Sequence, residues 1–246
     1  MVSLEQGRAL VWASAAVAGH VDVLEPVVVE PLRRGLFFRS RHISMTSNSF
    51  VDSDMYRPKH KRNLLVFCGL FHPEKQAHRL AAALPTVVAR LAEADVRDVA
   101  FAFCGRDASD ARLADAVCDL KLSIPVSVGY EPNPGGLLAE AKVFFSLQRT
   151  TNYPSKSLLE AMSSGCVPIV TDVGSTRRIA TDDFAQFVPK DFTPEQVASA
   201  ATTILTFDAA TFDRYSSAAR AFAMTRFSVE AMASYYENIY SSLVEQ

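Results

Sequence analysis

The sequence lacks the patterns that identify several common kinds of site. Its four cysteines, Cys68, Cys104, Cys118 and Cys166, form no Cys-x-x-Cys pair and show no metal-ligand spacing. No GxGxxG motif follows the first strand-like run of the domain, and neither GxxxxGK(S/T) nor GxSxG occurs. A dinucleotide cofactor, a P-loop nucleotidase and an α/β-hydrolase are therefore poorly supported, and we expect no metal and no cofactor.

An excess of charge and long apolar runs are also missing. Lys and Arg number 25 and Asp and Glu 27, so the formal net charge of -2 gives no electrostatic case for nucleic acid as a partner. No apolar run approaches the roughly 18 residues of a helix that spans a bilayer. Most of the cysteines lie in or beside apolar runs, where cysteine behaves as a small hydrophobe. We expect reduced thiols and a cytoplasmic location, and leave peripheral attachment to the inner membrane face open.

Alternating strand-like and helical patterns fill the chain from Asn63 onward. The helical patterns cover about residues 75–92, where Pro85 should kink or divide the helix, residues 112–120, and the tail from Thr193 to the end. The strand-like runs are Leu64–Cys68, Val99–Cys104, Val126–Gly129, Lys142–Leu147, Cys166–Thr171 and Phe184–Val188. Strands joined by helices in this way predict an α/β fold, a Rossmann-like doubly wound parallel sheet.

The first sixty residues follow a different pattern. Residues His20–Leu36 suit a helix interrupted by prolines, and His42–Thr46 suits a strand. Ser47–Pro58 is a turn-rich link. We therefore divide the chain into a shorter piece, residues 1–60, and a Rossmann-like domain, residues 61–246.

The segment from Asn152 to Gly174 is the most informative part of the chain. It combines a polar loop, a short helix with one inward acid, Glu160, and a buried strand. Ser155, Lys156 and Ser157 begin the helix, where free backbone N–H groups and the helix dipole attract phosphate. The Glu160 carboxylate, a turn further in, can accept hydrogen bonds from a sugar diol. A solvent-facing Glu160 is the alternative.

Two other loops also follow strands, where open α/β sheets bind ligands. In the first, Gly69 allows a sharp turn and Lys75 lies near a helix start, where an ammonium group could face a phosphate. In the second, Gly105 allows a close turn and Arg106 could touch a base or a phosphate. Either could also be a plain βα loop with an exposed cation.

Four segments resemble landmarks of the group 1 (family 4) glycosyltransferases of GT-B fold, in the right order. They correspond to the interdomain link, the G-R-L-x-x-x-K loop, the E-x7-E region and the terminal helix. In this chain they read SMTSNSFVDSDMYRP, LLVFCGLFHPEK, VFFSLQRTTNYPSKSLLEAMSSGCVPIVTDVGS and TRFSVEAMASYYENIY. The resemblance implies that residues 61–246 are the C-terminal, nucleotide-sugar-binding half. Residues 1–60 would then be the end of the N-terminal, acceptor-side domain and the interdomain link.

The resemblance also implies residue roles. Lys75 should contact the donor's diphosphate, and Glu160, the candidate catalytic residue, should hold the ribose. The backbone around Ser157 and Leu158 should cap the phosphates, and transfer should proceed with retention and without a metal. The complete predicted donor site is Gly69, Lys75, Arg106, Asn152, Ser155, Lys156, Ser157, Leu158 and Glu160.

The chain departs from the family pattern in two places. Leu70 stands where the family has arginine, and Asn152 stands at the first glutamate of E-x7-E, unless one extra loop residue moves that position to Thr151. Two hypotheses therefore stay open. The chain transfers sugar from a nucleoside diphosphate sugar to a sugar or lipid-linked acceptor, with a second domain or chain completing the cleft. Alternatively, it is a non-catalytic nucleotide-sugar-binding module. A GT-B nucleotide-sugar epimerase is a third, weaker alternative.

Overall fold

The computed structural model describes residues 20–23, 42–45, 50–105 and 110–244. The chain forms two compact units, of which the larger is Ser49–Val229. The smaller combines Met1–Asn48 with Glu230–Gln246. Within the described residues, no helix has both the length and the apolar character needed to cross a membrane. The predicted boundary at residue 60 stays a prediction.

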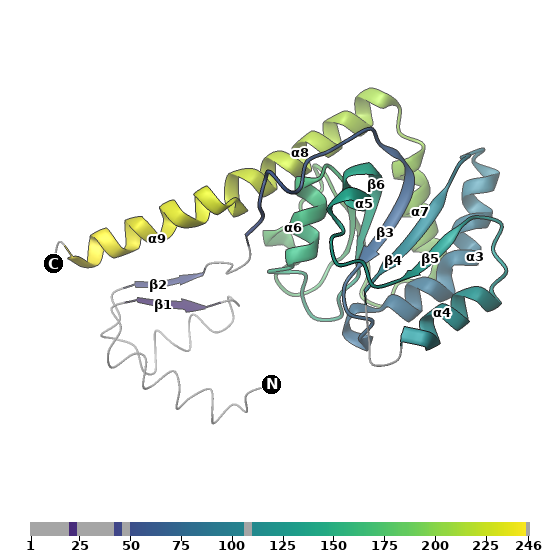
Figure 1. Ribbon diagram of the computed structural model, residues 1–246, viewed down its shortest axis with the longest axis horizontal. Helices are drawn as coiled ribbons and strands as arrows, with labels where there is room; N and C mark the ends of the chain where they lie inside the picture. Colours follow the sequence, from purple (N-terminus) through teal and green to yellow (C-terminus); the bar gives the residue numbers. More distant parts are fainter. Residues whose placement is uncertain (1–19, 24–41, 46–49, 106–109, 245–246) are drawn as a thin grey trace. The chain divides into compact units, whose positions relative to one another are not determined.

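The larger unit is built on one parallel six-stranded sheet (Figure 1). Its strands are β3 (Arg62–Cys68), β4 (Ala100–Cys104), β5 (Val126–Gly129), β6 (Ala141–Ser146), β7 (Val167–Thr171) and β8 (Gln186–Val188). Their spatial order is β5-β4-β3-β6-β7-β8. Counted within the sheet, this is 3-2-1-4-5-6, the Rossmann order, which reverses direction between β3 and β6. The predicted fold class is confirmed.

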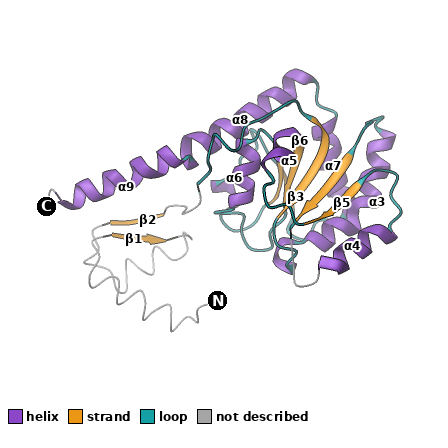
Figure 2. Ribbon diagram, viewed as in Figure 1, coloured by secondary structure: helices purple, strands orange, loops and turns teal. Residues whose placement is uncertain are grey.

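Helices cover both faces of this sheet, as Figure 2 shows. On one face α3 (Ala77–Glu93) packs against α4 (Asp110–Asp119) and α7 (Pro194–Leu205). On the other, α6 (Lys156–Ser163) packs against α5 (Gly135–Glu140) and α8 (Ala209–Phe227). The connections between strands therefore switch faces where the strand order reverses, which leaves a crevice at the carboxyl edge of the sheet.

Aromatic packing on the central strands holds that edge in place. The ring of Phe101 lies 4.7 Å from that of Phe103 and 5.5 Å from that of Phe145. Phe67 lies 5.9 Å from Phe103, so rings from β3, β4 and β6 form one cluster. Each of these side chains is fully buried, which stabilises the fold by roughly 1.5–3 kcal/mol apiece. The loops that follow these strands consequently start from fixed positions.

Of the two alternatives for Pro85, division of the helix is wrong: α3 is one helix, although Pro85 has no N–H to donate within it. The tail from Thr193 is helical as predicted over its described residues, and it consists of three helices, α7, α8 and α9 (Val229–Val244). Asp208 begins α8 by accepting a hydrogen bond from the backbone N of Thr211 at 2.7 Å.

The helix predicted over His20–Leu36 is wrong in its described part. His20–Val23 is a strand, β1, which pairs in parallel with β2 (His42–Met45). The alternation of polar and apolar residues in His-Val-Asp-Val is typical of a strand. The predicted strand over His42–Thr46 is confirmed over β2, and the rest of the predicted helix lies outside the described residues.

Candidate functional site

Glycines end three neighbouring strands at the carboxyl edge. The backbone N of Gly69, after β3, donates to the carbonyl oxygen of Cys104, and that of Gly105, after β4, donates to Gly129, both at 2.9 Å. A Cβ added to Gly105 would lie 1.9 Å from the carbonyl oxygen of Gly69. Only glycine therefore lets these two loops approach so closely.

A pocket of about 280 Å³ opens beside these glycines. Its walls come from the ends of β3, β4 and β5 and from the start of α6. The lining residues are Cys68, Gly69, Leu70, Cys104, Gly105, Tyr130, Glu131, Pro134 and Ser157. Cys68 and Cys104 are register partners on adjacent strands, so their thiols share this end of the sheet. The pocket thus lies at the reversal point where open α/β sheets bind ligands.

Lys75 brings a positive charge to the loop after β3. It ends a short 3-10 helix, η1 (Pro73–Lys75), and Gln76 then turns the chain into α3 with a φ of 56°. The Lys75 Cδ lies 3.9 Å from the position that a Cβ on Gly69 would occupy. Burial lowers the pKa of Lys75. A phosphate group beside this ammonium would offset the lost hydration and favour its charged form.

The start of α6 faces the same pocket. Its N-cap residue, Ser155, makes no capping hydrogen bond with its side chain, and the Ser155 Oγ lies 3.4 Å from the Ser157 Oγ. The start of α7 differs, because the Thr193 side chain accepts a bond from the backbone N of Gln196 there. The first turn of α6 therefore lacks the side-chain cap that α7 has, while the buried Leu158 side chain anchors it.

Glu160 lies one turn deeper on the face of α6 that carries Ser157. The residue is only 9% exposed. Burial raises the pKa of Glu160, while a hydrogen bond from Tyr56 and the charge of Lys156 oppose that rise. The Lys156 Nζ is 4.0 Å from Glu160 Oε1, but its side chain is 68% exposed and solvent weakens the attraction.

Asn152 is turned into the protein. Its Nδ2 donates to the Thr171 carbonyl oxygen at 3.1 Å and to Thr176 Oγ1 at 3.0 Å. Its Oδ1 accepts from Ser146 Oγ at 2.7 Å, and the residue is 1% exposed. These bonds tie the loop after β6 to the end of β7. The predicted contact of Asn152 with a donor stays a prediction.

The remaining predicted residues divide into those near the pocket and those that cannot be placed. Gly69 and Ser157 line it, and Lys75 lies close to Gly69. Ser155 and Lys156 stand at the start of the helix beside it, and Glu160 follows Ser157 by one turn. Arg106 lies outside the described residues. Among the described residues, no group of three or more His, Cys, Asp or Glu side chains could hold a metal ion.

Sequence reasoning missed several residues at the pocket. Tyr130 and Glu131 follow β5 and line it, and the carbonyl oxygen of Tyr56, in the link before β3, accepts from Ser163 Oγ of α6 at 2.9 Å. The rule that ligands bind beyond the carboxyl ends of strands could have found the first two. Tyr56 carries no such signal, because its contact depends on the fold.

The family follows from comparison with known proteins. Residues 62–206 match the family of group 1 glycosyl transferases, which is more than half of the chain. The chain belongs to the group 1 glycosyltransferases. No curated protein matches this glycosyltransferase sequence.

Several solved structures share its fold. Anabaena HepE, in complex with UDP and glucose, has a TM-score of 0.77 at 16% identity, covering 98% of this chain and 68% of that one. An S. aureus TarM variant with fondaparinux, alpha-GlcNAc-glycerol and UDP has a TM-score of 0.72 at 20% identity, and the match covers 96% of this chain and 46% of that one. Sucrose-phosphate synthase from Thermosynechococcus elongatus has a TM-score of 0.72 at 19% identity, and the match covers 99% of this chain and 64% of that one. This glycosyltransferase chain thus spans about half the length of the TarM structures.

Proposed function

We propose that the pocket binds the nucleoside diphosphate of a nucleotide-sugar donor, and that the chain belongs to an enzyme that transfers the sugar of this donor. The observation that carries the proposal is the meeting of three features at one reversal point: the uncapped start of α6, Lys75 and the buried Glu160. HepE structures with UDP and with UDP-glucose, which share the fold, support the choice of ligand.

Each feature matches a different part of the donor. The N–H groups at the start of α6 and the ammonium of Lys75 suit the two phosphates. The Glu160 carboxylate, which accepts hydrogen bonds but donates none, suits the ribose hydroxyls. The distance along α6 from Ser157 to Glu160 is one helical turn, which fits phosphates at the helix start and a ribose further in.

The same groups would also assist transfer. When the bond between the sugar and the diphosphate breaks, negative charge grows on the departing phosphate oxygen. The α6 dipole and Lys75 would stabilise that charge without a metal ion. We propose transfer with retention, to a sugar or lipid-linked acceptor.

The rest of the enzyme is part of the proposal. Residues 61–246 would form the donor-binding domain, and residues 1–60 the end of the acceptor-side domain with its link. A second domain or chain would complete the cleft, and the location would be cytoplasmic. Leu70, which is 58% exposed at the pocket, supplies no charge there, so Lys75 carries more of the phosphate interaction.

Calorimetric titration of the purified chain with UDP, GDP and ADP tests donor binding. We expect one nucleotide to bind. Glu160→Gln should lower the affinity for this nucleotide by about 10- to 100-fold, the loss expected for hydrogen bonds to a charged group. Glu195→Gln, on the surface of α7, is the matched control and should change nothing. The proposal is wrong if no nucleotide binds, or if the two variants bind alike.

Release of nucleoside diphosphate from the matching sugar donor distinguishes the hypothesis of an active enzyme from that of a non-catalytic binding module. With an acceptor extract present, an enzyme releases it and Glu160→Gln releases less. Binding without release, with the acceptor-side domain supplied, would favour the non-catalytic module.

A further inference from the structure

We propose that Cys68 and Cys104 form an oxidative modification site in the wall of the pocket beside Gly69 and Gly105, where a peroxide joins their thiols into a disulfide that lowers nucleotide affinity. This inference rests on the proposed function, because it assigns a means of regulation to the same pocket. Neither cysteine is among the residues predicted to bind the donor.

The two cysteines are neighbours across the sheet. β3 and β4 run in parallel, and Cys68 is the register partner of Cys104 at the last position of their pairing. The backbone N of Gly69 donates to the carbonyl oxygen of Cys104 at 2.9 Å, so hydrogen bonding between the strands continues one residue beyond the pair. Adjacent strands lie about 4.7–4.9 Å apart, within the roughly 4.4–6.8 Å that separates the Cα atoms of disulfides. The backbone therefore holds the two residues at a distance that a disulfide can span.

Both side chains face the pocket. Successive residues of a strand point to opposite faces of the sheet. The preceding residues, Phe67 and Phe103, lie in the core cluster that includes α3, so Cys68 and Cys104 face the other side, where α6 begins. Both cysteines line the pocket together with Ser157 of α6. Cys104 is 9% exposed and Cys68 is partly exposed, so a small oxidant that enters the pocket meets both thiols.

The other two cysteines have different surroundings. Cys118 is exposed on α4. Cys166 is fully buried, and its Sγ donates to the carbonyl oxygen of Leu138 at 3.2 Å. All four thiols are free in the structure, so the resting state of the pocket is the dithiol. The pair in the pocket wall thus combines access from solvent with a second thiol on the neighbouring strand.

Oxidation by hydrogen peroxide takes two steps. The adjacent Cys68 thiol lowers the pKa of Cys104 by more than burial raises it, so Cys104 supplies the first thiolate. This thiolate attacks one peroxide oxygen, the O–O bond breaks, and the hydroxide that leaves takes up the thiol proton to give water and a sulfenic acid. The Cys68 thiolate then attacks the Cys104 sulfur, the S–S bond forms, and the S–O bond breaks to release a second water. Two thiols lose two electrons in total, and one peroxide is reduced to two waters.

The disulfide disturbs the loops that place the phosphate contacts. It brings its two Cβ atoms to about 3.8 Å, closer than the spacing of the strands themselves. The loops beyond have no free space, because a Cβ added to Gly105 would lie 1.9 Å from the carbonyl oxygen of Gly69. The Lys75 Cδ lies 3.9 Å from the position of a Cβ on Gly69. Drawing the strand ends together therefore displaces the loop that carries Lys75, and nucleotide affinity falls.

The first test is oxidation of the full chain with one equivalent of hydrogen peroxide, followed by tryptic digestion without reductant and mass spectrometry. Lys75 and Arg97 lie between the two cysteines in the sequence, so trypsin separates them unless a disulfide joins them. We expect the two peptides to be joined, with two hydrogen atoms fewer than their sum. Cys118→Ser is the matched control and should give the same product. Thiols that oxidise singly, or a disulfide from Cys68 to Cys118 or Cys166, overturn the inference.

Calorimetry with UDP measures the consequence of the disulfide. Oxidation should lower the UDP affinity of the chain by about 5- to 100-fold, the usual range for two coupled events, and dithiothreitol should restore it. Cys68→Ser, compared with its own reduced form, should lose no affinity after the same treatment. An equal loss in Cys68→Ser, or an unchanged affinity in the disulfide form, overturns the inference while leaving the proposed function intact.

A second test needs no variant. Phenylarsine oxide exchanges its oxygen for two thiols, forming two As–S bonds and releasing water, so stable binding requires two thiols side by side. We expect native mass spectrometry to show one arsenical per chain, released by dithiothreitol and not by a monothiol. A chain that binds none overturns the inference. If the reduced chain binds none of UDP, GDP and ADP, the proposed function fails, and the oxidation site then stands or falls on the joined peptides alone.

Discussion

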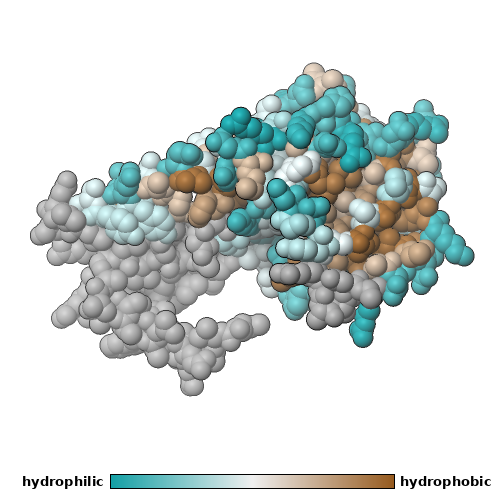
Figure 3. All heavy atoms as spheres, in the orientation of Figure 1, coloured by the Kyte–Doolittle hydropathy of each residue, from teal (hydrophilic) through white to brown (hydrophobic). Residues whose placement is uncertain are grey.

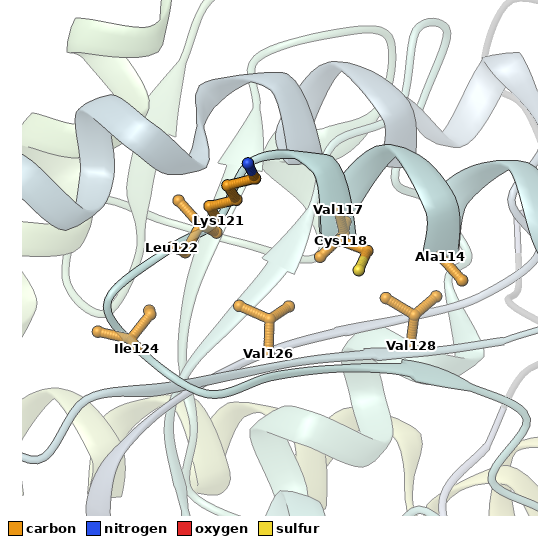
Figure 4. Close-up of a pocket in the computed structure, with 8 residues that line it drawn as sticks. All are labelled: Ala114, Val117, Cys118, Lys121, Leu122, Ile124, Val126 and Val128. Atoms are coloured by element: carbon orange, nitrogen blue, oxygen red, sulfur yellow. The ribbon is translucent and has the colours of Figure 1, made fainter.

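The proposed donor pocket, beside Gly69 and Gly105, and a groove at the edge of the sheet differ in their lining residues and in their position. The edge groove, of about 340 Å³, lies between α4 and β5 and is the larger. In Figure 4, Val126 and Val128 of β5 point toward α4, whose Val117 and Ala114 point back. Figure 3 shows apolar residues gathered over this side of the unit. The proposed donor pocket is instead lined by glycine backbone, Glu131 and the start of α6 at Ser157, with Lys75 close to Gly69 and Glu160 one turn further along α6.

The difference follows from where each space lies. The edge groove is a gap in the apolar packing of an edge strand, and Lys121 and Cys118 are its few polar side chains. The donor pocket lies where the strand order reverses, so the ends of β3 and β4 and the start of α6 converge there. Volume alone would select the edge groove, whereas position at the reversal point selects the proposed donor pocket.

The largest effect should come from filling the space between the glycine loops. In Gly105→Ala, the new Cβ would lie 1.9 Å from the Gly69 carbonyl oxygen. We expect unfolding measured with urea to show a loss of about 3 kcal/mol or more in the free energy of unfolding, together with lost UDP binding. Gly129→Ala, whose Cβ would meet nothing within 4 Å, should cost far less. Equal losses would mean that the loops do not need their close approach.

The next largest effect should come from removing a lysine side chain, which should lower UDP affinity at the donor pocket but not at the edge groove. Lys75→Met should lower the affinity for UDP by about 10- to 100-fold, measured by calorimetry, whereas Lys121→Met in the edge groove should leave this affinity unchanged. Burial lowers the pKa of Lys75, so wild-type affinity should fall as pH rises through that pKa, below the range of an ordinary lysine. This alkaline decline should vanish in Lys75→Met. A variant that keeps the decline would exclude Lys75 as its source.

Thiol labelling offers an internal comparison without mutation. Cys68 and Cys104 line the donor pocket, and the exposed Cys118 lines the edge groove. We expect iodoacetamide to label Cys118 fastest, as read by peptide mass spectrometry. Saturating UDP should slow labelling of the two pocket thiols by severalfold and leave Cys118 unchanged. Protection of Cys118 instead would move the nucleotide to the groove.

The smallest effect should come from the groove itself. Val117→Ala removes two buried methyl groups and should lower the free energy of unfolding by about 1–2 kcal/mol. UDP affinity should stay at the wild-type value, because no donor group is near. Reduced affinity at equal folded fraction would contradict the assignment of the groove to packing alone.

Strands were the most predictable elements, because short apolar runs that end at glycine or charge mark buried strands. The run Leu64–Cys68 lies within β3, and Val126–Gly129 matches β5. Helix ends were harder, since the stop before α8 depends on the Asp208 cap rather than on periodicity. At His20–Val23 a four-residue pattern was too short to decide between helix and strand.

The site was predictable where one segment builds it and unpredictable where several do. Ser157 and Glu160 are three residues apart on α6, so their common face follows from helical spacing. The hydrogen bonds of Asn152 join partners on β6, on β7 and in the loop after β7. The Tyr56 contact similarly requires α8 to hold the link in place. Tertiary contacts of this kind leave no local pattern.

Photoaffinity labelling with a UDP-sugar that carries an azide on its base tests the central claim most directly. The account predicts label, competed by excess UDP, on peptides that contain the pocket residues Leu70, Tyr130 or Ser157. Lys75→Met should reduce this label, and Lys121→Met should not. Competed label on residues 112–122 of α4 and its following turn would contradict the account, because it would place the nucleotide in the edge groove.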